Sequence, residues 1–166
     1  MPKIEALAKA IEVAHGYTSG IVESVDHSEW FRQPGEGLTH VAWQVGHMAV
    51  AQYSLTLRFV RGEQPGDSDF IPPEYFKLFG RGSQPEGDAG KYPSPAEIYA
   101  VFNNVYAEVM ATIPSYSDEL LAEPIIGSHP AFEFKEQTLR FCPMHETSHT
   151  GQISLLKRLF GHAPLR

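Results

Sequence analysis

Cysteine is almost absent from this 166-residue chain, and the one thiol, Cys142, cannot form an internal disulfide. Long apolar runs are absent too, since none approaches the roughly 18 residues of a membrane-spanning helix. The N-terminal stretch lacks the continuous apolar core and small-residue cleavage site of a secretory signal. We therefore expect a cytoplasmic protein that does not cross a membrane.

Positive charge is also in short supply. The chain has 13 Lys and Arg against 20 Asp and Glu, which gives a formal net charge of -7. Such a balance provides no basic face that could neutralise a phosphate backbone or an anionic membrane surface. We expect neither nucleic acid nor membrane as a partner, and a small molecule as substrate. The length and the 42% hydrophobic content suit a single domain over residues 1–166.

Strongly alternating strand segments are missing, and apolar residues recur instead at helical spacing. The stripe from Ile4 to Val25 predicts a first helix. Thr39 is placed to cap a second helix, which Gly62 ends. These two segments would each present one apolar face to a common core.

The second half of the chain predicts two further long helices. Residues 94–97, Ser-Pro-Ala-Glu, form a capping box with proline at the first helical position, so a third helix begins there. The last helix should start between Thr138 and Cys142, because Pro143 is tolerated in a first turn but not deep inside a helix. Gly161 should end it. Between these helices, residues 115–124 could hold one short helix, and residues 132–137 are polar and extended.

Residues 62–93 carry five prolines and six glycines, which excludes a long helix or strand there. One short helical turn is expected at residues 74–79. A connection of this length either shapes a site or subunit contact, or is a surface excursion without a role. The expected fold is all-α: an antiparallel up-and-down four-helix bundle with a long Pro/Gly-rich connection between helices two and three.

Two histidines in the last helix point to a metal. His145 and His149 are four residues apart, so they rise about 6 Å along the axis and project from one face. Gln152 and Leu156 continue that face, which indicates that it looks toward the core. A hydrogen-bonded pair of core histidines is the alternative. A third available histidine favours the metal.

Helix two offers two candidates for the third ligand. His40 and His47 lie about 10.5 Å apart along a helix, too far to share an ion whose Zn–N bonds are about 2.0 to 2.1 Å. His47 is deeper in the helix, and Gly46 beside it leaves room for a neighbouring helix. His40 is expected at the mouth or surface, and His15 in the core or beside the site. No role is assigned to the three remaining histidines, at positions 27, 129 and 162.

Residues 145–149, His-Glu-Thr-Ser-His, also match the HExxH pattern of zinc proteases, in which Glu146 would be the general base. The thermolysin type needs a glutamate from a later helix, but no Asp or Glu follows His149. The metzincin type needs a glycine and a histidine where Gln152 and Leu155 stand. Both versions fail.

Two motifs together resemble the DinB-like (DinB/YfiT) superfamily of metal-dependent enzymes. They are THVAWQVGHMA at residues 39–49 and HETSHTGQISLLKRL at residues 145–159. The capped third helix and the long Pro/Gly-rich connection fit as well, so the resemblance covers nearly the full chain. It implies a four-helix bundle with a divalent metal, commonly zinc or nickel, bound by His47, His145 and His149. It also implies a homodimer.

The resemblance leaves the reaction open. Some relatives transfer low-molecular-weight thiols such as bacillithiol or mycothiol to electrophiles, some isomerise maleylpyruvate, and many have no known activity. Three neutral imidazoles leave an ion an open position, which suits a thiol transferase or a hydrolase of small substrates. A non-catalytic bundle that binds a ligand or a partner is the third hypothesis.

Three further side chains near the pair were considered for roles. Glu146 is a weak candidate for a general base, because it is rotated by about 100° from His145. Gln152 could hydrogen-bond a ligand or orient an imidazole, or simply bridge helices. Cys142 is expected to be a packed, inert thiol.

Overall fold

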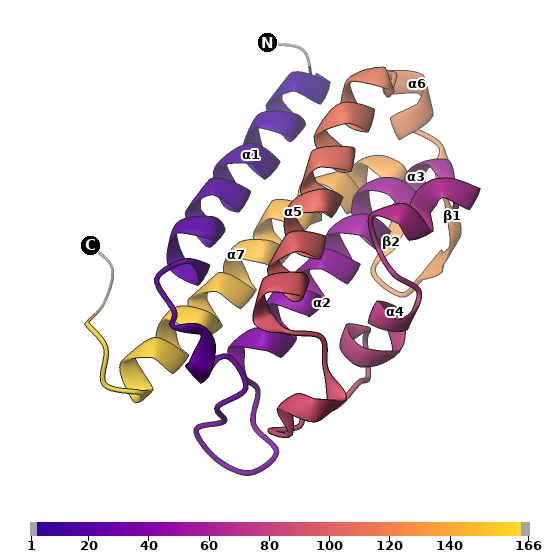
Figure 1. Ribbon diagram of the computed structural model, residues 1–166. Helices are drawn as coiled ribbons and strands as arrows, with labels where there is room; N and C mark the ends of the chain where they lie inside the picture. Colours follow the sequence, from indigo (N-terminus) through magenta and orange to yellow (C-terminus); the bar gives the residue numbers. More distant parts are fainter. Residues whose placement is uncertain (1–2, 164–166) are drawn as a thin grey trace.

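The computed structural model describes residues 3–163, and its long helices lie side by side and pack on one another as in a bundle (Figure 1). This confirms the mainly helical fold. The long helices are α1 (Lys3–Val22), α2 (Val41–Tyr53), α5 (Pro95–Thr112) and α7 (Lys135–Leu159). The shorter elements are α3 (Phe59–Arg61), α4 (Glu74–Phe79), α6 (Asp118–Leu121), β1 (Pro124–His129) and β2 (Phe132–Phe134).

Helix α2 lies at the centre of the core, and its cap differs from the predicted one. The cap is His40, not Thr39: the Nδ1 atom of His40 accepts the Trp43 N–H at 3.1 Å. A wider π-type turn (Ser54–Arg58) carries the helix on into α3. Gly62, with φ of 79°, then ends it as predicted. The short helix predicted at residues 74–79 is α4.

For the other two long helices, α5 and α7, one predicted start is confirmed and one is wrong. The capping box of α5 is confirmed, with Ser94 N–H donating to the Glu97 carboxylate at 2.8 Å. The predicted start of α7 is wrong, because α7 begins at Lys135 and Pro143 lies inside it. Proline inside a helix removes one backbone hydrogen bond and crowds the carbonyl four residues before it, at a cost of about 3 kcal/mol. The turn before it is secured by packing, since Leu139 and Cys142 are buried.

The predicted order of helix directions is also wrong for the second and third long helices. The rings of His40 and Tyr92 lie 5.4 Å apart at the start of α2, and Tyr116 Oη donates to the Thr56 carbonyl at 2.9 Å near its end. Helices α2 and α5 are therefore parallel, and both rise together in Figure 1. Residues 62–93 run back along the bundle, a long crossover in place of a tight turn.

Helices α1 and α7 are parallel to each other as well. The hydroxyls of Thr18 and Thr150 are 2.7 Å apart, and Lys157 donates to Ser24 further along both helices. On its other side α7 packs against α2 in the opposite direction. This antiparallel pair is the frame that carries the candidate site.

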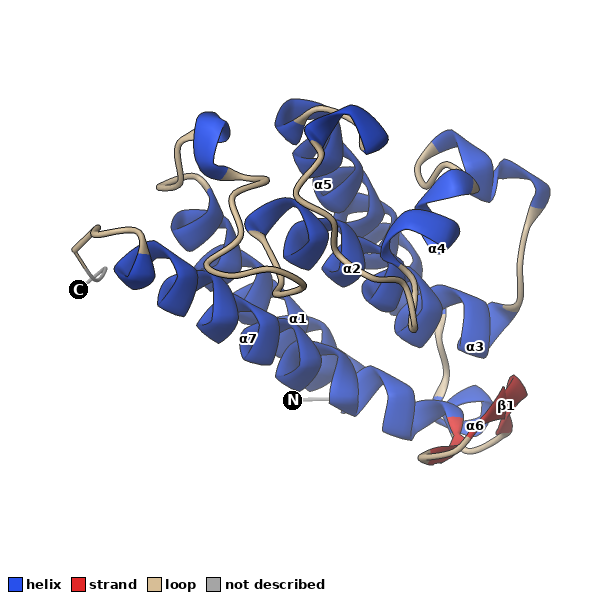
Figure 2. Cartoon of the chain, turned by 90° about the horizontal axis from the view of Figure 1, so that it is seen from below, coloured by secondary structure: helices blue, strands red, loops and turns tan. Residues whose placement is uncertain are grey.

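A small hairpin was not predicted. Strands β1 and β2 pair antiparallel, with Pro124 opposite Phe134 and His129 opposite Phe132, and they lie beside α6 and the α3 end of the molecule (Figure 2). Five of the six β1 residues are not buried, so no apolar alternation marks the strand in the sequence. Across the described residues, no helix is both long enough and apolar enough to cross a bilayer.

Candidate metal centre

The antiparallel packing of α2 on α7 brings His47 next to His145 and His149. One ring nitrogen from each of the three histidines lies within 4.8 Å of the other two. The Nε2 atoms of His145 and His149 are 3.1 Å apart. Two nitrogens bound at 2.0 to 2.1 Å to one tetrahedral ion lie about 3.4 Å apart, so the spacing suits a shared ion.

The far side of two of these rings is held by a hydrogen-bond acceptor. His47 Nδ1 lies 2.7 Å from the Phe79 carbonyl oxygen, which can only accept, so Nδ1 carries the proton. His149 Nδ1 lies 2.5 Å from Gln44 Oε1. In both rings the Nε2 lone pair is therefore left facing the other histidines. Partners of this kind fix the tautomer and orientation of metal-binding histidines.

Gln44 is oriented by a network of its own. Its Nε2 atom donates to Thr39 Oγ1 at 2.8 Å and to Gln152 Oε1 at 2.9 Å, which directs its Oε1 atom at His149. Gln152 thus belongs to the hydrogen-bond network behind His149, which it joins through Gln44. Gln44 was not among the predicted site residues, although it lies three residues before His47 on the same helix face.

Gly46 explains how the Phe79 carbonyl reaches His47. A Cβ atom on Gly46 would lie 2.5 Å from the Phe79 ring, so only glycine admits that ring. The element that approaches is the short helix α4, which ends at Phe79. The glycine therefore allows the close contact that was predicted for it.

Burial keeps the three imidazoles neutral. Together with the neighbouring histidines, it lowers the pKa of His145 to about 4 and that of His149 to about 3. Burial also lowers the pKa of His47. At neutral pH all three rings carry a free lone pair, the form that binds a metal ion.

Glu146 lies on the other side of α7. Its side chain is buried, its Oε2 atom accepts from Gln52 Nε2 at 3.2 Å, and its Oε1 atom lies 3.8 Å from His15 Nδ1. Burial raises the pKa of Glu146 to about 7. None of these contacts reaches the three histidines. The general-base role of Glu146 stays a prediction without a contact that supports it.

His15 completes this second polar cluster. Its ring is stacked on Tyr106 with centroids 3.7 Å apart, and Nε2 donates to Asn103 Oδ1 at 3.1 Å. Its Nδ1 lone pair therefore faces Glu146. Within residues 3–163, His15 Nδ1, Gln52 Oε1 and Glu146 Oε1 are buried without a hydrogen-bond partner. A proton on Glu146 would fit between the carboxyl group and His15.

Three other predicted positions can now be placed. His40 is fully buried, so the expected position at the mouth or surface is wrong: as the cap of α2 it turns inward, and its Nε2 lies 3.0 Å from the Glu86 carbonyl. Cys142 is buried inside α7, and burial raises the pKa of its thiol well above the usual value. His129, to which no role was assigned, lines the cavity beside the site.

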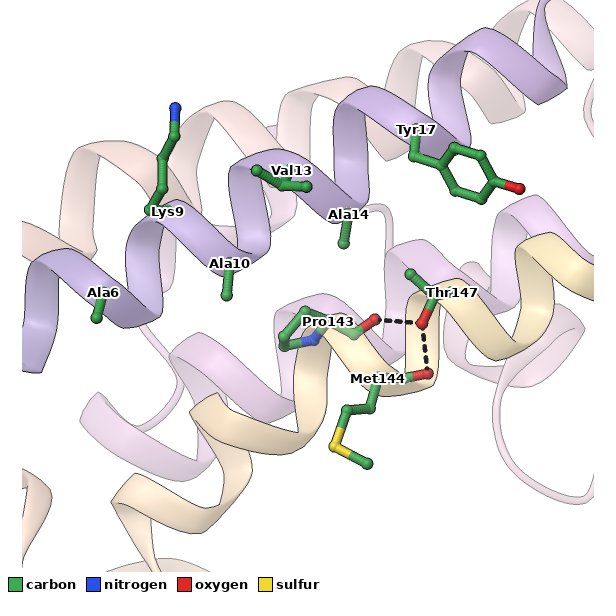
Figure 3. Close-up of a pocket in the computed structure, with 9 residues that line it drawn as sticks. All are labelled: Ala6, Lys9, Ala10, Val13, Ala14, Tyr17, Pro143, Met144 and Thr147. Atoms are coloured by element: carbon green, nitrogen blue, oxygen red, sulfur yellow. Dashed lines mark hydrogen bonds between the residues drawn. The ribbon is translucent and has the colours of Figure 1, made fainter. Parts of the chain in front are cut away.

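A cavity of about 650 Å³ opens beside the cluster, and His47 and His145 form part of its wall. A second hollow of about 540 Å³ lies on the outer face between α1 and α7, lined by apolar side chains such as Ala10, Val13 and Met144 (Figure 3). None of the three clustered histidines lines this outer groove. The first cavity is therefore the candidate functional site.

Comparison with known proteins agrees with this geometry. The family model of the DinB superfamily matches residues 10–153. The chain belongs to the DinB superfamily. The resemblance drawn from the two histidine motifs is thus confirmed, and this DinB-superfamily chain brings together three of the four histidines that those motifs contain.

A solved structure shares the fold of this DinB-superfamily chain. It is a conserved protein from Enterococcus faecalis, with 15% sequence identity and a TM-score of 0.64 over 96% of this chain and 97% of that one. At this identity the likeness concerns the fold alone. Among proteins with curated descriptions, none matches.

Proposed function

We propose that this protein is a metal-dependent enzyme whose divalent ion, zinc or nickel, is held by His47, His145 and His149. The observation that carries the proposal is the convergence of three neutral ring nitrogens within 4.8 Å, two of them on rings fixed from behind. Structural zinc sites are closed by four protein ligands, whereas three leave a position for substrate. The donor set therefore suits catalysis.

The chain's own residues would prepare this site in three ways. The Phe79 carbonyl and Gln44 hold two imidazoles in one tautomer, and burial keeps all three rings neutral. Aromatic side chains such as Phe141 cover the neighbouring cavity wall and limit the access of water. A divalent ion with three neutral ligands supplies Lewis acidity and lowers the pKa of a bound thiol or water.

Transfer of a low-molecular-weight thiol to an electrophile is the reaction that we favour. A hydrolase of this kind needs a general base close to the attacking water. Among the described residues no carboxylate lines the cavity, and Glu146 is held by Gln52 on the other side of α7. A thiol loses its proton at a metal ion without such a base. Metal-dependent hydrolysis is the second candidate, favoured only by the match of residues 145–149 to HExxH.

The test begins with protein purified without a histidine tag. We expect about one divalent ion per chain by elemental analysis, and conjugation of bacillithiol, mycothiol or glutathione to an electrophile such as monochlorobimane. Chelator should abolish conjugation without unfolding the protein, and added zinc or nickel should restore it. Absence of bound metal would favour a non-catalytic bundle that binds a small ligand or a partner.

The homodimer implied by family resemblance is also a proposal. Exposed apolar side chains on the outer groove, Val13, Tyr17 and Met144, are compatible with a second copy of the chain. Sedimentation equilibrium measures the mass directly. A monomer at micromolar concentration would reject the homodimer and leave the metal site untouched.

A further inference from the structure

The cavity beside the histidine cluster has mostly apolar walls built from four separate parts of the chain. Helix α2 and its π-type turn form one wall, the end of α4 and the hairpin form two more, and α7 closes it with His145. Its aromatic members are Phe59, Phe76, Phe132 and Phe141. A pocket of this volume and lining suits a small organic molecule with an apolar body.

Four of the rings form a continuous path from the hairpin to a candidate metal ligand. His129 is stacked on Phe132 at 4.5 Å between centroids, Phe132 lies 5.1 Å from Phe141, and Phe141 lies 5.7 Å from His145. The path gives a flat or ring-shaped body a surface along its whole length. One end of such a molecule would lie at the histidines and the other toward the hairpin.

The charge of the cavity is opposite to that of the chain. The chain has a net charge of -7, yet within the part of the chain that the structure describes the cavity is lined by Arg58 and Arg81 and by no Asp or Glu. Arg58 is paired with Glu63 at 2.8 Å. Arg81 takes part in no ion pair or side-chain hydrogen bond among residues 3–163. Arg81 is therefore the cation that remains available to a ligand.

We propose that this cavity selects a small carboxylate with an apolar, ring-bearing body, whose carboxylate pairs with Arg81 while its other end faces His145. A guanidinium binds a carboxylate through two parallel hydrogen bonds, which gives direction as well as affinity. Arg58 contributes less, because Glu63 already neutralises it. This substrate class rests on the proposed function, since it places the reacting end of the molecule at the histidines.

The experiment compares two probes of the same shape, 3-phenylpropionate and its neutral amide, by isothermal titration calorimetry. Both are titrated into zinc-loaded and into chelator-treated full-length protein. We expect the carboxylate to bind roughly tenfold more tightly than the amide in both forms, because a charge-assisted hydrogen bond is stronger than a neutral one. The chelated form shows that the preference does not come from a metal ion.

Three variants locate the effect. R81Q should remove the tenfold preference, while R158Q, which loses the same charge from an exposed site at the far end of α7, should keep it. A51W, which fills the cavity at a wall residue, should abolish binding of both probes. Circular dichroism and thermal melting verify that each variant is folded.

The results separate this proposal from the proposed function. Equal affinity for the two probes, no binding of either, or an unchanged preference in R81Q would overturn the assignment of the carboxylate, whatever the metal content. Absence of bound metal in the wild-type protein would overturn the metal-dependent enzyme, while a carboxylate preference that R81Q removes would still establish the ligand class. R81Q should also retain the wild-type metal content, because Arg81 is not one of the proposed metal ligands.

Discussion

The two sides of α7 carry different polar clusters, a half-buried one of three histidines and a buried one that joins Glu146 to His15. On the side toward α2, His145 and His149 lie beside His47, and the rings of His47 and His149 each have a hydrogen-bond acceptor behind them. On the other side, Glu146 lies against His15 with three buried polar atoms unpartnered within residues 3–163. The rings of His47 and His149 are oriented by hydrogen bonds to Phe79 and Gln44, whereas the Nδ1 atom of His15 has no hydrogen-bond partner among residues 3–163.

An i, i+4 pair of histidines therefore does not place the glutamate between them in the same site. Adjacent helical residues point about 100° apart, so His145 and Glu146 cannot face one centre unless the helices around them allow it. In this structure the two histidines face α2, whereas the Glu146 side chain lies between α1 and α2. Four experiments test this division of roles.

The largest effect is expected for His149→Ala, which removes one of three ligands. The protein should lose its bound divalent ion completely after desalting, as measured by elemental analysis. His15→Ala on the opposite side is the control and should keep the full metal content. A full content of bound metal in His149→Ala would contradict the assignment of the metal to the side of α7 that faces α2.

A smaller loss is expected for Gln44→Met, which removes the acceptor behind His149 and keeps the side-chain volume. Loss of such a partner typically weakens metal affinity by about 10- to 100-fold. The matched control is Gln52→Met, two turns further along α2, whose side chain contacts Glu146 instead. Competition against a chromophoric zinc chelator measures both affinities. An equal loss in the two variants would contradict the proposed orienting role of Gln44.

Acid stability distinguishes the second cluster. Burial lowers the pKa of His15 to about 4, whereas its hydrogen bond to Asn103 opposes this shift. A histidine with a depressed pKa favours the folded state at pH values above about 6.5, the pKa of the same side chain in the unfolded protein. This contribution is lost as the pH falls toward 4. Between pH 7 and pH 4, the free energy of unfolding of His15→Gln should therefore fall by roughly 2 kcal/mol less than that of the wild type.

The free energy of unfolding, obtained by urea denaturation of chelator-treated protein at both pH values, measures that difference. The clustered histidines also become protonated in acid, but they do so in both proteins and cancel in the comparison. Identical losses in the two proteins would show that His15 is not held neutral by its surroundings.

The smallest effect is expected for Glu146→Gln. If Glu146 does not act on the substrate, metal content should be unchanged and conjugation activity should stay within about threefold of wild type. A general base typically contributes 10²- to 10⁴-fold. A loss of that size at full metal content would place Glu146 in the reaction and favour the hydrolase.

Much of the site could be predicted because its parts are local. The i, i+4 spacing of His145 and His149 follows from helix geometry, and the depth of His47 in α2 follows from its distance to the helix start. The hydrogen bonds behind the rings could not be predicted in the same way. Gln44 is on α2 and contacts His149 on α7, and the Phe79 carbonyl is a backbone group at the end of α4, which no side-chain pattern marks.

Local signals in the amino-acid sequence were enough to predict the capping box at Ser94 and the stop at Gly62, because such signals act within a few residues. Tertiary structure alone decided that α5 runs parallel to α2, that Pro143 stays inside α7 and that a hairpin walls the cavity. These features depend on packing between segments far apart in the chain, and no local pattern reports that energy.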